Sequence, residues 1–155
     1  MAEKDQAQAQ ASEWERNLEL LRRGTAAYNE GDLSFVIELA AEDVEVHADA
    51  ALLNSGTFQG KEEFLRWMQS WSEAWSELAL EVRGVETFED RFMVVDVFQT
   101  GVGSASGVPV EMELVQVIEV GGGEIKRFHL YPDRAMAEAT LERLRAVEAS
   151  AGDDA

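Results

Sequence analysis

Asp96 is the residue whose type and setting most directly suggest chemistry. It lies within Phe92–Phe98, a segment in which every other residue is apolar. Strand alternation would place Phe92, Val94, Asp96 and Phe98 on one face. A carboxylate with a raised pKa in an apolar pocket can act as a general acid or base. A two-residue turn at Glu89-Asp90 would instead set Arg83 across from Asp96 and neutralise it, so both interpretations stay open.

Two further polar residues are candidates for a site. Gln116 interrupts an apolar strand face, where its amide could orient a ligand carbonyl or hydroxyl, or could be a core amide bonded to backbone. His47, at the end of a short strand, is the second catalytic candidate, and a surface or interface role competes with it. The side chains expected to line a ligand pocket with Gln116 are Tyr28, Trp67, Trp71, Phe98, Met112, Phe128 and Leu130.

Periodicity predicts the elements that position these residues. Residues Val110–Val120 and Glu124–Tyr131 alternate as two long strands around the glycine turn Gly121-Gly122-Gly123. The other expected strands are Asp43–Ala48, Leu78–Phe88 and Arg91–Thr100, and the expected helices begin at Glu13, Leu33, Lys61 and near Met136. Asn29-Glu30-Gly31-Asp32 is expected to end the first helix and cap the second. This order predicts an α+β fold in which one strongly curved antiparallel sheet wraps around the N-terminal helices.

Length and composition narrow the classes of function. A chain of 155 residues suits one domain, expected at residues 13–148, with flexible tails at 1–12 and 149–155. The net charge of −18 argues against nucleic acid and against anionic membrane surfaces as partners. With no cysteine, two histidines and no phosphate-binding loop, we expect neither a metal nor a cofactor. No apolar run approaches the roughly 20 residues of a membrane helix and no signal peptide is evident, so we expect a cytoplasmic protein.

The convex face of the sheet predicts a partner. No predicted helix remains to cover its apolar residues, so we expect a homodimer formed by sheet-on-sheet packing. The residues expected at that interface are Val95, Val97, Val115, Val117, His129 and Tyr131.

From about Trp14 to Leu144 the chain resembles a SnoaL-like member of the nuclear transport factor 2-like superfamily. The segments that carry the resemblance are Ala26–Leu33, Glu42–His47, Gly56–Phe64, Ser106–Glu111 and Gly123–Asp133. The resemblance implies a cone-shaped α+β barrel. Relatives include polyketide cyclases, ketosteroid isomerases, limonene-epoxide-hydrolase-like enzymes and non-catalytic binding domains, so the fold alone does not assign an activity.

The family's catalytic positions are largely without functional groups here. By the resemblance, the isomerases' tyrosine falls on Gly24 and their base on Ala48, while an aspartate of the hydrolases and cyclases falls on Leu130. Only Asp96 matches a family carboxylate. The expected function is therefore a pocket for a small, uncharged, apolar molecule, with cofactor-free acid–base catalysis (isomerase, cyclase, dehydratase or hydrolase) by Asp96. The alternative is a non-catalytic module that binds a ligand or a protein through the same fold.

Overall fold

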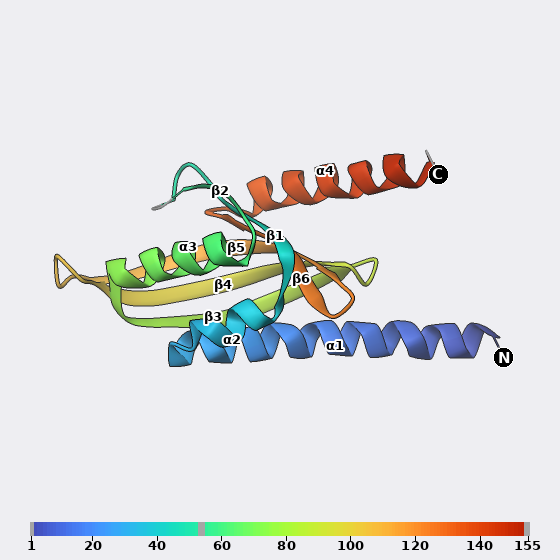
Figure 1. Ribbon diagram of the computed structural model, residues 1–155, viewed down its shortest axis with the longest axis horizontal. Helices are drawn as coiled ribbons and strands as arrows, with labels where there is room; N and C mark the ends of the chain where they lie inside the picture. Colours follow the sequence, from blue (N-terminus) through green and yellow to red (C-terminus); the bar gives the residue numbers. More distant parts are fainter. Residues whose placement is uncertain (1, 53–54, 154–155) are drawn as a thin grey trace.

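The computed structural model describes residues 2–52 and 55–153, and the side chains of residues 13–52 and 55–147. Its elements follow one another as α1 (Ala2–Glu30), α2 (Leu33–Glu38), β1 (Ala40–Ala48), β2 (Gly56–Gln59), α3 (Lys61–Ala74), β3 (Trp75–Phe88), β4 (Phe92–Gly103), β5 (Pro109–Gly121), β6 (Glu124–Tyr131) and α4 (Arg134–Asp153). The predicted α+β class is confirmed (Figure 1).

Six strands form a single sheet in the order β2-β1-β6-β5-β4-β3. The sheet is curved and not closed into a barrel, since β2 and β3 lie at its opposite edges. The four long strands pair antiparallel as predicted, whereas β1 and β6 run parallel, with His47 opposite His129. Strand β2 was not predicted, because a segment of four residues shows too short a pattern to count as a strand.

The predicted stops and turns lie where the local residue types favour them. Gly31 takes a positive φ of 79° after α1, and the Asp32 side chain caps α2 by accepting a hydrogen bond from the Phe35 backbone N–H at 3.3 Å. Gly122 and Gly123 adopt φ values of 59° and 78° in the turn between β5 and β6. These residues therefore determine where the chain reverses.

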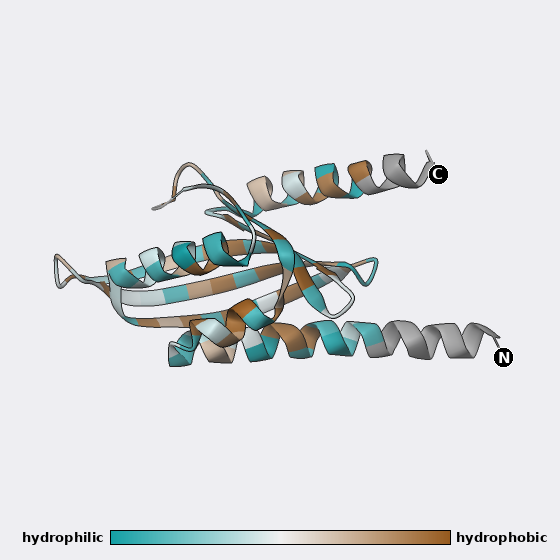
Figure 2. Ribbon diagram, in the orientation of Figure 1, coloured by the Kyte–Doolittle hydropathy of each residue, from teal (hydrophilic) through white to brown (hydrophobic). Residues whose placement is uncertain are grey.

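The sheet carries helices on both faces, and each face has its own apolar cluster (Figure 1). On the inner face, Val46, Val95, Leu114 and Ile118 pack with residues of α1, α2 and α3. On the outer face, Val94 and Val117 belong to a second cluster with residues of α4. Figure 2 shows apolar residues along the central strands and along the part of α1 next to them. The inner face is where a pocket can form.

The predicted domain limits and flexible tails stay predictions. Residues 2–12 continue α1, and α4 extends to Asp153, while Met1 and residues 154–155 lie outside the described residues. Within the described ranges, no helix combines the length and the hydropathy needed to cross a membrane. The cytoplasmic location also stays a prediction.

Candidate functional site

A cavity of about 90 Å³ lies between the inner face of the sheet and helices α1, α2 and α3. It is lined by Leu20, Leu21, Gly24, Thr25 and Tyr28 of α1, Val36 of α2, Phe64, Trp67, Met68 and Trp71 of α3, and Leu80, Met93, Val97, Gln99, Leu114, Gln116, Ile118, Ile125, Phe128 and Leu130 of the sheet. Trp67 also borders a surface groove next to Phe58 and Arg66, so this indole lies between the cavity and the exterior. The cavity is thus close to the surface at α3.

The cavity wall is apolar apart from a few neutral polar groups. None of the described lining residues carries a carboxylate, an imidazole, an amine or a guanidinium. The one titratable lining residue among them is Tyr28. Burial raises the pKa of its phenol, and a side-chain hydrogen bond with Trp71 acts in the opposite direction. Tyr28 therefore keeps its proton at neutral pH and can serve as a neutral hydrogen-bond partner.

Gln99 is the lining residue that the sequence analysis missed. Its side chain is buried, and its Oε1 accepts a hydrogen bond from the Trp71 indole Nε1 at 3.3 Å. Its Nε2 is buried without any hydrogen-bond partner among the described residues. Alternation along β4 could have found it, because Met93, Val95, Val97 and Gln99 form the face opposite to Asp96.

Most of the predicted pocket residues do meet at the cavity. Tyr28, Trp67, Trp71, Gln116, Phe128 and Leu130 all line it. Met112 packs against the inner core cluster without lining the cavity. Phe98 lies under the guanidinium of Arg83, whose carbon is 3.9 Å from the ring centroid, and it does not line the cavity. Whether a ligand binds to these residues stays a prediction.

The predicted position of Asp96 in the pocket is wrong. Asp96 lies on the outer face, where its two carboxylate oxygens accept hydrogen bonds from Arg134 of α4 at 3.0 and 2.9 Å. Its side chain is 45% exposed, so it is not a carboxylate enclosed by apolar groups. The catalytic role expected of Asp96 rested on that enclosure and loses its structural argument.

The predicted pairing of Asp96 with Arg83 is also wrong. The strand register brings Gly84 opposite Asp96, because the turn takes up residues 89–91 and Phe88 pairs with Phe92. The expected two-residue turn would have paired the strands one residue differently. A shift of one residue reverses the face of a strand side chain, which explains the misplaced partner.

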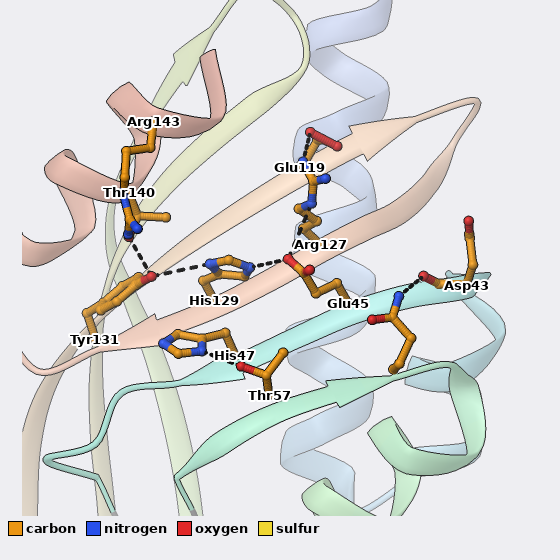
Figure 3. Close-up of polar contacts among 11 residues, drawn as sticks. Asp43, Glu45, His47, Thr57, Glu119, Arg127, His129, Tyr131, Thr140 and Arg143 are labelled. Atoms are coloured by element: carbon orange, nitrogen blue, oxygen red, sulfur yellow. Dashed lines mark hydrogen bonds and ion pairs between the residues drawn. The ribbon is translucent and has the colours of Figure 1, made fainter. Parts of the chain in front are cut away.

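His47 lies in a polar network on the outer face, away from the cavity (Figure 3). Its Nδ1 is 2.9 Å from the Thr57 hydroxyl, and its ring centroid is 5.3 Å from that of His129. The Nε2 of His129 is 2.9 Å from the Glu45 carboxylate, and its Nδ1 is 3.2 Å from the Tyr131 hydroxyl. These histidines therefore do not face the cavity, so nothing supports the expected assistance from His47.

The network continues from both ends of this chain of contacts (Figure 3). The Thr140 hydroxyl of α4 donates to the Tyr131 hydroxyl at 2.5 Å. Arg127 bridges Glu45 at 3.3 Å and Glu119 at 3.1 Å. Burial lowers the pKa of His129, and the hydrogen bond and charge of Glu45 oppose that shift. The described residues contain no group of three or more ligating side chains suited to a metal ion.

The argument for a homodimer rested on an uncovered outer face, and that premise is wrong. Ala137 and Leu141 of α4 pack there in a cluster with Phe92, Val94, Val115, Val117 and Tyr131. Val115, Val117, His129 and Tyr131 do lie on this face, but Val95 and Val97 belong to the inner cluster. The homodimer stays a prediction without this support.

Comparisons with solved structures show the same fold. A protein with a ketosteroid isomerase-like fold from Catenulispora acidiphila, solved in complex with trimethylamine, is 15% identical with a TM-score of 0.66, over 73% of this chain and 84% of that chain. A nuclear transport factor 2-like protein of unknown function from Burkholderia pseudomallei is 19% identical with a TM-score of 0.69, over 78% of this chain and 93% of that chain.

A nuclear transport factor 2-like protein from Burkholderia thailandensis is 18% identical with a TM-score of 0.67, over 74% of this chain and 88% of that chain. No curated protein matches the chain. The SnoaL-like domain family matches residues 21–128, which span the cavity-lining helices and most of the sheet. By this match, the chain belongs to the SnoaL-like domain family.

Proposed function

We propose that this protein binds a small, uncharged, mostly apolar molecule in the cavity between the inner face of the sheet and helices α1, α2 and α3, without acid–base catalysis at that site. The observation that carries the proposal is the cavity wall itself, which combines aromatic and aliphatic side chains with neutral polar groups only. Apolar pockets with a few polar groups that orient a ligand are the usual form of a small-molecule site.

The size of the cavity limits the ligand. A cavity of about 150 Å³ can hold one benzene molecule, so about 90 Å³ leaves room for a ligand with no more than one ring of that size. A charged ligand is disfavoured, because no described lining residue could neutralise it in an apolar setting.

Tyr28, which keeps its proton at neutral pH, is the one ionisable group among the described lining residues, and this supports binding over catalysis. At the two family positions that line the cavity, Gly24 and Leu130 offer no functional group. The remaining candidates, Asp96 and His47, make their contacts on the outer face. General acid–base catalysis needs a group within hydrogen-bond reach of the substrate. The relative from Catenulispora acidiphila, solved with trimethylamine, shows that a related fold is compatible with a bound small molecule.

A binding screen tests this proposal. Trp67 and Trp71 line the cavity, so their fluorescence should report occupancy by small neutral ring compounds, with thermal stabilisation as a second readout. We expect the wild type and Asp96→Asn to bind the same compounds with equal affinity and to convert none of them. Loss of binding or of turnover in Asp96→Asn would contradict the proposal.

Gly24→Leu is the matched variant that fills the cavity from α1. A Cβ at Gly24 would meet Leu39 Cδ1 at 3.5 Å, an ordinary contact, and leucine favours a helix more than glycine does. We expect this variant to fold, as judged by circular dichroism, and to lose binding. Unchanged binding in the folded variant would show that the compounds bind elsewhere.

A further inference from the structure

We propose that the ligand of this cavity carries a hydrogen-bond acceptor, a carbonyl or ether oxygen, and that Gln99 is the residue that selects it. This inference rests on the proposed function, because it names the class of molecule that the same cavity takes. It concerns specificity, which the shape and hydropathy of the cavity do not decide.

Gln99 places a buried amide in the wall of the cavity. Gln99 belongs to β4, is 3% exposed and lines the cavity wall with its strand neighbours Met93 and Val97. Across the strands it pairs with Leu80 and Met112, both of which are apolar. In such surroundings a polar group destabilises the folded protein unless its donors and acceptors are paired.

Trp71 determines which end of the amide is available. An indole N–H can only donate, so the atom 3.3 Å from Trp71 Nε1 must be the amide oxygen. The Nε2 group with its two N–H donors is then turned away from Trp71. It has no hydrogen-bond partner among the described residues. Gln99, a residue of the cavity wall, thus holds an unused donor whose orientation a neighbouring side chain sets.

An unused buried donor favours a ligand that supplies an acceptor. The protein has already lost the hydration of this amide, so a bound oxygen would restore a hydrogen bond and only the hydration of the ligand oxygen is lost on binding. A cationic ligand would meet N–H donors and no described carboxylate, which disfavours it. The Trp75 Nε1 is also buried without a partner, but Trp75 is not part of the cavity lining and adds nothing to this selection.

Two probes of equal shape separate this inference from simple apolar binding. Cyclohexanone and methylenecyclohexane differ in having an oxygen or a CH₂ group at the same position. We expect the wild type to bind the ketone roughly tenfold more tightly, as one recovered hydrogen bond implies. Titrations followed by tryptophan fluorescence and by calorimetry measure the two dissociation constants.

Gln99→Leu should abolish the preference for the ketone while binding of the alkene is kept. Gln99→Met, which keeps the length of the side chain, serves the same purpose if the leucine variant does not fold. Asp96→Asn, on the outer face of the same strand and outside the cavity lining, is the control, and we expect it to keep the preference. Trp71→Phe removes the donor that orients the amide, so the preference should shrink.

The outcomes distinguish the two proposals. Equal binding of both probes by the wild type would overturn the role of Gln99 and would indicate that a retained water satisfies the amide. An unchanged preference in folded Gln99→Leu would overturn it as well. Failure of the wild type to bind either probe, or any other neutral ring compound, would contradict the proposed function itself.

Discussion

His129 is a buried imidazole with a partner on each ring nitrogen. Glu45 lies on one side, Tyr131 on the other, and His47 and Arg127 are close enough to influence its charge. Burial outweighs the attraction of Glu45, so the pKa of His129 in the folded protein lies below the ordinary value of about 6.5. The neutral imidazole is thus the form that this network stabilises.

This shift predicts how stability depends on pH. Above about pH 6.5 the imidazole is neutral in both states, whereas below that pH the unfolded chain binds the proton first. We therefore expect His129 to lower the free energy of unfolding as pH falls from about 6.5 toward its folded pKa, by at most about 1.4 kcal/mol per pH unit. Urea unfolding between pH 5 and pH 8 measures this slope for the wild type and for His129→Gln.

The wild type and His129→Gln share the same carboxylates, so the difference between their two slopes gives the contribution of His129. His47→Gln is the matched control, because His47 lies in the same network on the same face. We expect His129→Gln to lose part of the wild-type slope and His47→Gln to lose less, because it removes only the influence of His47 on His129. The same slope in all three proteins would show that His129 titrates alike in the folded and unfolded states.

At the scale of elements, α4 is the cover of the outer sheet face. Ala137 and Leu141 lie in its apolar cluster, and Arg134 at its first turn binds Asp96 of β4 and pairs with Glu86 of β3. The ion pairs are partly exposed, so they add little to stability and mainly set the position of the helix. Burial of apolar side chains contributes most of the free energy that holds α4 on the sheet.

Leu141→Ala tests this attachment. Leu141 is 5% exposed, and truncating a buried leucine typically lowers the free energy of unfolding by about 2–5 kcal/mol. We expect a loss in that range, whereas Glu142→Ala, at the exposed neighbouring position, should change the value by less than about 0.5 kcal/mol. Urea unfolding measures both. A loss at Leu141 no larger than that at Glu142 would mean that α4 does not pack on the sheet in solution.

At the scale of the whole molecule, charge is the dominant feature. The net charge is −18, with 31 acidic and 13 basic residues. Such an excess repels itself within the folded chain and opposes contact between two copies. A homodimer would therefore have to form although α4 packs on the outer face of the sheet, and it would have to overcome the repulsion between two negatively charged copies.

Salt should therefore stabilise the protein at neutral pH. Screening weakens the self-repulsion, so we expect the thermal midpoint at pH 7 to rise with added NaCl, by about 2–4 °C for each kcal/mol of repulsion removed. Near the isoelectric point of about 4.3 the net repulsion vanishes and the same salt should not stabilise. Scanning calorimetry at both pH values measures the effect. A thermal midpoint at pH 7 that does not change with salt would show that the charges of the folded protein do not repel one another on balance.

Several features were predictable because local residue types decide them. Alternation along Val110–Val120 placed Gln116 on the inner face, and the helical stripe of α3 placed Trp67 and Trp71 at the cavity. The Asp32 cap and the glycine turn at Gly122-Gly123 follow from side-chain chemistry and backbone freedom at those residues. The family resemblance, carried by short segments in order, was confirmed by the match over residues 21–128.

Periodicity depends only on neighbours in the chain, so the sequence by itself determined the helices and the longer strands, though not β2, and the two sets of residues on each of these strands. Which set of β4 faces inward was decided by tertiary structure. Both of its faces are apolar between Phe92 and Phe98, so alternation alone does not choose between them; the packing of α1, α2 and α3 on one face and of α4 on the other left Asp96 outside and Gln99 in the cavity wall. The position of α4 on the outer face likewise arises only when distant segments pack together, since the residue pattern of α4 does not indicate which surface it packs against.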